Sequence, residues 1–268
     1  MIKVESALAQ TQGSRDYQED TAAIWPGGNN PFVDVPMSGV AMSGAKAGGL
    51  KFAVLADGMG GHAGGSLASR LVCDHFLSAA TSLEGGPAAR LAAGLAAAND
   101  AIARKVFVAP AFAGMGSTLI GAAFSHLGLE WVSVGDSPMF LYRRGDIVVL
   151  NEDHSLAPEL DRQVAAGRLT GEQARRDPRR HMLRSAVTGD EIDLIDVSRA
   201  PLALEPHDVV ILASDGIATI DTTEISRIVA ARANEGAAPT ARALIRAVED
   251  VRMSHQDNTT VVVVRVLG

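Results

Sequence analysis

The sequence predicts an α/β (α+β) sandwich, in which two central antiparallel β-sheets pack face to face and pairs of helices flank them. Short segments that favour strands follow one another through tight turns, which is typical of antiparallel hairpins. Segments with helical spacing occur in pairs, once in each half of the chain. Because no repeat or interdomain linker interrupts the sequence, we expect residues 1–268 to form a single domain.

The first elements are two strands on either side of a charged turn. The strands are expected at residues 4–11, where polar and apolar residues alternate, and through residues 24–25. The charged turn occupies residues 14–20 between them. Residues 26–49 are rich in Gly, Pro, Asn and Ser and show no period, which indicates a loop insertion. A strand at residues 51–56 should follow this loop.

Two helices are expected next, at residues 65–80 and 87–108, where small and apolar residues recur at helical spacing. Their small side chains allow them to pack closely over a sheet. Four strands with short connections should follow, at residues 117–124, 129–134, 139–143 and 147–150. The last two are joined by a turn with glycine at its centre, which is typical of a hairpin.

Residues 156–184 show a broken helical pattern that is rich in arginine. The seven arginines are Arg162, Arg168, Arg175, Arg176, Arg179, Arg180 and Arg184. Two interpretations remain open for this segment, a solvated helical surface and a flap that faces a substrate. The rest of the chain predicts strands at 192–198, 208–213 and 259–266 and helices at 222–233 and 239–253.

Charge and composition exclude several classes of protein. The formal net charge of -7 argues against nucleic-acid binding, which requires clustered Lys and Arg. The single cysteine, Cys73, cannot form an intrachain disulfide, and its apolar surroundings indicate a buried thiol. The N-terminal residues lack a secretory signal, and the most apolar windows are shorter than the roughly 20 residues that cross a bilayer. We therefore expect a soluble, cytoplasmic protein with no membrane partner.

Five aspartates stand at the predicted strand boundaries: Asp20, Asp57, Asp136, Asp215 and Asp257. In antiparallel sheets the start of one strand lies beside the end of its neighbour, so these residues can converge on one edge. Crowded carboxylates resist ionisation unless a cation neutralises them. Oxygen ligands without a cluster of His or Cys favour Mg²⁺ or Mn²⁺ over Zn²⁺. The pattern therefore predicts a site for hard divalent cations.

The Gly-rich segment 56–65 has an alternative interpretation, because Gly58-x-Gly60-x-x-Ala63 formally matches a relaxed dinucleotide-binding fingerprint. In that case Asp57 would lie against a pyrophosphate and repel it, and the strands expected here are antiparallel instead of forming a βαβ unit. Beside a metal ion, the same glycines let the backbone approach closely, and the Gly58 carbonyl can become a ligand. We therefore prefer the metal-site interpretation.

Seven short segments carry most of the chemistry-bearing residues, and each of them is a weak signal alone. In chain order they are Arg15-Asp-Tyr-Gln-Glu-Asp20, Ala56-Asp-Gly-Met-Gly-Gly-His62, Gly114-Met-Gly-Ser-Thr-Leu119, Val134-Gly-Asp-Ser137, Leu150-Asn-Glu-Asp-His-Ser155, Ala213-Ser-Asp-Gly216 and Asp257-Asn-Thr259. Together, and in this order, they resemble the PP2C-like (PPM) family of serine/threonine protein phosphatases, bacterial type. The resemblance covers nearly the whole chain.

The resemblance implies an αββα sandwich with a centre of two Mn²⁺ or Mg²⁺ ions and, as in many bacterial members, a third ion. Asp57 would bridge the first two ions, and Asp136 with Asp215 would bind the third. The implied ligands, direct or through water, are Glu19, Asp20, Asp57, the Gly58 carbonyl, Asp136, Asp215 and Asp257.

The activity that the resemblance implies is hydrolysis of phosphoserine and phosphothreonine in proteins by a metal-activated water, which would reverse a Ser/Thr kinase. Arg15 would hold two phosphate oxygens, and His62 would protonate the leaving oxygen as a general acid. For His154, which also lies in a family segment, we predict a structural role in a polar turn. We expect a monomer whose partners are phosphorylated proteins and the opposing kinase.

Two positions depart from the family pattern, and neither is a metal ligand. Gln18 stands where an asparagine is common, and Pro138 stands where an arginine is common, which is expected to change the local loop. Two other functions remain open at this point. One is a pseudophosphatase that binds phosphoproteins without turnover, and the other is a hydrolase of small phosphate esters or nucleotides.

Overall fold

The computed structural model describes residues 3–26, 50–61, 63–232 and 234–268. The insertion predicted at residues 26–49 therefore lies, apart from its first residue, outside the described residues. Within the described ranges, no helix combines the length and the apolar character needed to span a membrane.

The first sheet has five strands in the order β1-β11-β10-β7-β8. Every neighbouring pair in it is antiparallel. In chain order the strands are β1 (Val4–Thr11), β7 (Met139–Arg143), β8 (Asp146–Val149), β10 (Val209–Ala213) and β11 (Thr259–Val266).

The second sheet follows the order β2-β3-β5-β6-β9, and β4 pairs with the end of β3. All of these pairs are also antiparallel. Its strands are β2 (Asp20–Trp25), β3 (Lys51–Met59), β4 (Gly116–Ser117), β5 (Leu119–Ser125), β6 (Gly128–Val134) and β9 (Asp196–Val197).

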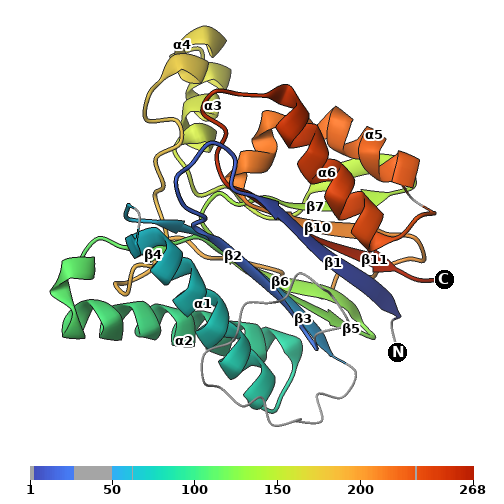
Figure 1. Cartoon of the computed structure of the whole chain (residues 1–268), viewed down its shortest axis with the longest axis horizontal. Coiled ribbons are helices and arrows are strands. Elements are labelled where there is room, and N and C mark those ends of the chain that lie inside the picture. The colour runs from blue at the N-terminus through green and yellow to red at the C-terminus, as the bar shows by residue number, and fades with distance from the viewer. Residues whose placement is uncertain (1–2, 27–49, 62, 233) are drawn as a thin grey trace.

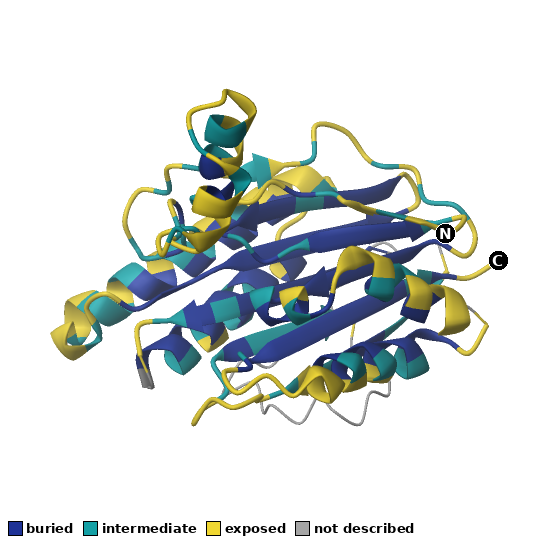
Figure 2. Cartoon of the chain, turned by 90° about the horizontal axis from the view of Figure 1, so that it is seen from above, coloured by how far each residue is buried: buried dark blue, intermediate teal, exposed yellow. Residues whose placement is uncertain are grey.

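Helix pairs cover the outer faces of the two sheets (Figure 1). The second sheet is covered by α1 (Ala63–Ser82) and α2 (Pro87–Val108), and the first sheet by α5 (Thr222–Arg232) and α6 (Ala237–Val251). Figure 2 shows the strands buried in the middle and the exposed residues on the outward sides of the helices. The predicted sandwich of two antiparallel sheets with flanking helix pairs is confirmed.

Both faces of each sheet are buried, which explains the run of four valines in β11. Val261 and Val263 face the core under α5 and α6, whereas Val262 and Val264 face the core between the two sheets. Successive residues of a strand point to opposite faces, so the part of a strand that is buried on both sides is expected to be a continuous apolar run. Each fully buried valine stabilises the fold by about 2 kcal/mol.

Two predicted segments differ from the observed elements. The strand predicted at 192–198 contracts to the two residues of β9, because Leu194 donates its backbone N–H to the Ser185 hydroxyl instead of to a neighbouring strand. The broken helical segment 156–184 contains two short helices, α3 (Ala157–Ala165) and α4 (Gly171–Arg176). Two 3₁₀ turns, η1 (Pro110–Phe112) and η2 (Asp215–Thr219), complete the described elements.

Candidate metal centre

Asp20 and Asp57 form a direct cross-strand pair between β2 and β3. Residues that lie directly opposite in antiparallel strands place their side chains on the same face, about 5 Å apart. Two carboxylates in such a pair repel each other, so the arrangement costs stability unless they share a proton or a cation. Asp20 is 5% exposed, and its Oδ2 accepts a hydrogen bond of 2.7 Å from the Ser214 hydroxyl.

Three turns bring Asp136, Asp215 and Asp257 to the same edge. Since β10 and β11 are antiparallel neighbours, the turn after β10, which carries Asp215, lies beside the turn before β11, which carries Asp257. β7 is the other neighbour of β10 and is also antiparallel to it, so the turn before β7, with Asp136, reaches this edge as well. The convergence predicted from strand boundaries therefore has its physical basis in the sheet order.

A cavity of about 780 Å³ contains most of the predicted site. The predicted residues that line it are Arg15, Glu19, Asp57, Gly58, Asp136, Asp215 and Asp257. Asp20 does not line the cavity but is buried beside it, next to Asp57. His62 lies outside the described residues.

Burial and mutual repulsion together raise the pKa values of these carboxyl groups. The pKa of Asp57 lies well above its ordinary value, first because of burial and then because of Asp20 and Asp215. Burial raises the pKa of Asp20 to about 7, and burial followed by the charge of Asp215 raises the pKa of Asp136 to about 7. Burial and then the charge of Asp257 raise the pKa of Asp215. At neutral pH the cluster therefore retains protons or requires a cation.

Three features of these residues fit a site for hard divalent cations. The side-chain donors of the cluster are oxygen atoms, which suit Mg²⁺ and Mn²⁺. Asp20 Oδ1 is buried and has no hydrogen-bond partner among the described residues. The backbone leaves no room for extra atoms, because a Cβ on Gly58 would lie 2.1 Å from the Gly65 carbonyl oxygen and one on Gly65 would lie 2.3 Å from Glu19 Oε1.

The carboxyl groups of the cluster are engaged with protein partners in this structure. Arg15 pairs with Asp257 at 2.5 Å, and the Ser214 hydroxyl donates to Asp20. Within the described ranges, no three His, Cys, Asp or Glu side chains already stand in an arrangement that could hold a metal ion. Binding of a cation would therefore exchange these contacts for metal bonds.

Comparison with known families decides the assignment. A family model for protein phosphatase 2C matches residues 41–258. The chain belongs to the protein phosphatase 2C family.

Named relatives of this protein phosphatase 2C chain are bacterial phosphatases. The serine/threonine protein phosphatase PstP of Mycobacterium tuberculosis is 35% identical over 220 residues, which cover 82% of this chain and 41% of that protein. The protein phosphatase PhpP of Streptococcus pneumoniae is 30% identical over 185 residues, 68% of this chain and 73% of that protein. The chain thus matches only about two fifths of the length of PstP.

Solved structures of the family share the whole fold. The crystal structure of the Mycobacterium tuberculosis phosphatase PstP/Ppp superposes with a TM-score of 0.75 at 30% identity and covers 99% of both chains. A structure of the PstP catalytic domain in complex with two manganese ions gives a TM-score of 0.73 at 29% identity, again over 99% of both chains. The metal-bound neighbour agrees with the oxygen-rich cavity found here.

Three side chains outside the predicted ligand set hold the segments that carry Glu19, Asp20 and Asp57 in this protein phosphatase 2C chain. Thr118 makes two hydrogen bonds with the backbone of Asp57. Asp57 N donates to Thr118 Oγ1 at 3.0 Å, and Thr118 N donates to the Asp57 carbonyl oxygen at 2.8 Å. Asn258 accepts from Glu19 N at 2.7 Å and donates to Tyr17 O at 3.0 Å. The unusual Gln18 accepts from Asp20 N at 3.0 Å, so its longer amide still supports this turn.

The arginine-rich segment contributes to the cavity at one end only. Four of its arginines pair with acidic residues of the same segment: Arg162, Arg176, Arg179 and Arg180. Such exposed pairs add little stability, so most of the segment is a solvated surface. Arg184, however, lines the cavity together with His181, whose positive form favours ionised Asp215. No periodicity in the sequence could have indicated these two positions.

The turn that contains Asp136 is held by His154. Gly135 N donates to His154 Nδ1 at 3.2 Å, and His154 N donates to the Gly135 carbonyl at 3.1 Å. The polar turn around this histidine is closed by the neighbouring Asp153, which accepts from Ser155 N at 2.7 Å. Pro138 follows in the same loop, and its carbonyl accepts from Ala213 N at 3.0 Å.

Proposed function

We propose that this chain is a metal-dependent protein phosphatase that hydrolyses phosphoserine and phosphothreonine in proteins and so reverses a Ser/Thr kinase. The observation that carries the proposal is the convergence of Glu19, Asp57, Asp136, Asp215 and Asp257 on one cavity, with Asp20 paired to Asp57 across the strands beside it. Membership of the protein phosphatase 2C family and the names of its relatives support the substrate class.

The acidic cluster supplies the ligands for two Mn²⁺ or Mg²⁺ ions and for a third. In this proposal Asp57 would be a ligand of both of the first two ions, and Asp136 with Asp215 would hold the third ion. Glu19, the Gly58 carbonyl and Asp257 would complete the first two sites. Asp20, which lies directly opposite Asp57, would support them directly or through water. When bound, the ions neutralise the carboxylates and supply an activated water for attack on phosphorus.

The remaining residues bind the phosphate and the leaving group. Arg15 is 54% exposed at the rim, so it can exchange Asp257 for two oxygens of a phosphate when Asp257 becomes a metal ligand. His62 follows the glycines of the metal-binding turn and donates a proton to the serine or threonine oxygen in this proposal. His181 and Arg184 line the cavity, where the guanidinium of Arg184 adds a positive charge. Their position supports a flap function for the end of the 156–184 segment.

In this proposal the phosphatase acts as a monomer of one domain in the cytoplasm. The experiment that tests the activity measures phosphate release from a phosphothreonine peptide and from a small phosphate ester. We expect turnover of the peptide with Mn²⁺, and complete loss after EDTA, because the cluster cannot activate water without cations. Unchanged turnover in EDTA would contradict the metal mechanism. Faster turnover of the small ester than of the peptide would contradict the protein substrate.

A further inference from the structure

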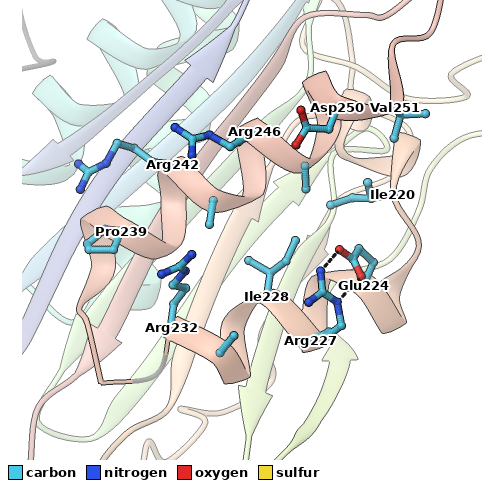
Figure 3. A pocket seen from close by; sticks show the side chains of 13 residues that line it. Ile220, Glu224, Arg227, Ile228, Arg232, Pro239, Arg242, Arg246, Asp250 and Val251 are labelled. Carbon is cyan, nitrogen blue, oxygen red and sulfur yellow. Dashed lines mark hydrogen bonds and ion pairs between the residues drawn. The ribbon is translucent and has the colours of Figure 1, made fainter.

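A groove with an apolar floor runs between α5 and α6 on the outer face of the first sheet (Figure 3). Its volume is about 670 Å³. The groove remains open because several side chains between the two helices are small alanines. The floor and its ends consist of Ile220, Ile228, Ala231, Pro239, Ala243, Ala247 and Val251.

The groove follows one face of α6 from Pro239 to Val251. The lining residues of α6 recur at steps of three and four, which places them on one side of the helix. The twelve steps from 239 to 251 correspond to about 18 Å along the helix axis. Val251, at the far end, is 47% exposed, so apolar surface continues to the rim. A helix of about three turns would match this length.

The rim of the groove is basic, although the whole chain carries a net charge of -7. Four arginines line it, Arg227, Arg232, Arg242 and Arg246, against two carboxylates, Glu224 and Asp250. The lining therefore carries an excess of two positive charges.

Local ion pairs neutralise only the arginines of α5. Arg227 pairs with Glu224 at 2.5 Å, as the dashed lines in Figure 3 show, and Arg232 pairs with Glu235 at 2.8 Å. Arg242 and Arg246 are exposed, and in the described part of the chain no ion pair involves either of them. These two residues lie one helical turn apart and repel each other. An anionic partner would relieve this repulsion.

We propose that the α5–α6 groove is a docking site for an acidic amphipathic helix of another protein. The apolar face of such a helix would cover Ile228, Ala243 and Ala247, which line the groove. Its carboxylates would face Arg242 and Arg246 at the rim. Helices that bind this way lay their apolar face into a groove, and charges at the edge set their orientation and partner choice.

None of the proposed metal ligands lines the groove, but the groove lies next to a cavity that two of them line. Ile220 lines the groove and also a second cavity of about 440 Å³, which Asp136 and Asp215 line as well. A partner in the groove would therefore lie next to the cavity that adjoins the metal centre. Because none of the proposed catalytic residues lines the groove, docking does not depend on the proposed function.

The test measures fluorescence anisotropy of a labelled synthetic helix with leucines on one face and glutamates on the other. We expect saturable binding that weakens as salt is added, because exposed charges are screened. The double variant Arg242→Glu, Arg246→Glu should weaken binding by roughly tenfold or more, since attraction becomes repulsion. Hydrolysis of p-nitrophenyl phosphate should stay unchanged, which shows that the variant folds and separates this result from the activity.

The matched control reverses the same number of charges elsewhere, with Arg104→Glu on α2 and Arg199→Glu after β9; both side chains are exposed. It should leave binding within about twofold of the wild type, since these positions lie away from the groove. Equal losses in the two double variants, or no binding of the labelled helix, would overturn the proposal.

Other occupants of the groove give distinct results. Equal binding of a glutamate helix with alanines in place of leucines would show attraction to charge alone and overturn the proposal. Preferential binding to phosphatidylserine vesicles, lost in Arg242→Glu, Arg246→Glu, would identify a membrane surface instead. A dimer seen by sedimentation and lost in the same variant would identify a second copy of this chain, which also overturns it.

Discussion

Burial and the charge of Asp257 raise the pKa of Asp215, and burial with the charges of Asp20 and Asp215 raises the pKa of Asp57 well above its ordinary value. The variant Asp215→Asn supplies an amide of nearly the same shape and removes one negative charge. We expect turnover to fall by more than about 100-fold, because a metal ligand is lost. Without metal, the variant should be at least as stable as the wild type at pH 8, because a repulsive charge is gone.

Initial rates with Mn²⁺ and the Tm in EDTA check this expectation. Turnover close to the wild-type value would contradict a ligand role for Asp215. A lower Tm together with lost activity would show that Asp215 serves the fold instead.

Gly65 offers a sharper test of the backbone around the centre. A Cβ at this position would lie 2.3 Å from Glu19 Oε1, so Gly65→Ala should displace Glu19 and weaken Mn²⁺ binding by roughly tenfold or more. The matched control is Gly64→Ala in the same helix, where the new Cβ would lie 3.6 Å from Met115 Cβ, an ordinary contact.

Titration calorimetry of Mn²⁺ with both variants measures the difference. Alanine favours helix formation over glycine by about 1 kcal/mol, so the control should bind metal normally and unfold no more easily than the wild type. Equal metal affinity in the two variants would contradict the close approach at Gly65.

At the scale of residues, the aspartates could be predicted because each lies at the boundary of a strand with a strong pattern. Gly65 and His181 could not. A glycine in a helical pattern does not reveal that the side chain of Glu19, distant in sequence, will pack against its Cα. His181 follows a segment without a clear period, and only the path of the chain brings it to the cavity. The conformation of His62 is outside the described residues, so its role stays a prediction.

Among the elements, β11 shows how burial on both faces governs stability. Val262 is fully buried between the sheets, whereas Val148 of β8 is 52% exposed at a sheet edge. We expect Val262→Ala to lower the free energy of unfolding by about 2–3 kcal/mol, from lost burial and the cavity left behind. Val148→Ala should change it by less than about 0.5 kcal/mol.

Urea unfolding in EDTA measures both variants without the contribution of bound metal. Similar losses for the buried and the exposed valine would contradict the burial on both faces of β11.

Elements with a strong period could be predicted from the sequence, and those held by side-chain contacts could not. The helix at 87–108 agrees with α2 at both ends, and the strand at 259–266 agrees with β11. The strand predicted at 192–198 was wrong except at Asp196 and Val197. Its alternating pattern resembled a strand, but the Ser185 hydroxyl occupies both backbone groups of Leu194, and the Ser198 hydroxyl accepts the Trp131 N–H that a longer ladder would need.

For the whole molecule, the crowded carboxyl groups make stability depend on pH. The pKa values of Asp20 and Asp136 rise from an ordinary 3.8 to about 7 in the folded protein, mainly because of burial. Between about pH 4 and pH 7 the folded state thus binds more protons than the unfolded state. The free energy of unfolding should therefore fall as pH rises through this range, when no metal is present.

Thermal unfolding in EDTA at pH 5.5 and pH 7.5 checks this, with the higher Tm expected at pH 5.5. Mn²⁺ should raise the Tm more at pH 7.5, because its ligands must lose their protons to bind it. A Tm that rises with pH in EDTA would contradict the raised pKa values.

The hydrogen bonds of Asn258 also have a consequence for synthesis. Its side chain joins Glu19 and Gln12, which precede it by 239 and 246 residues. The contacts that Asn258 makes to the turn with Glu19 and Asp20 can therefore form only after Asn258 has left the ribosome. A growing chain that lacks Asn258 would hold this turn with fewer contacts, so the proposed activity should arise late in synthesis.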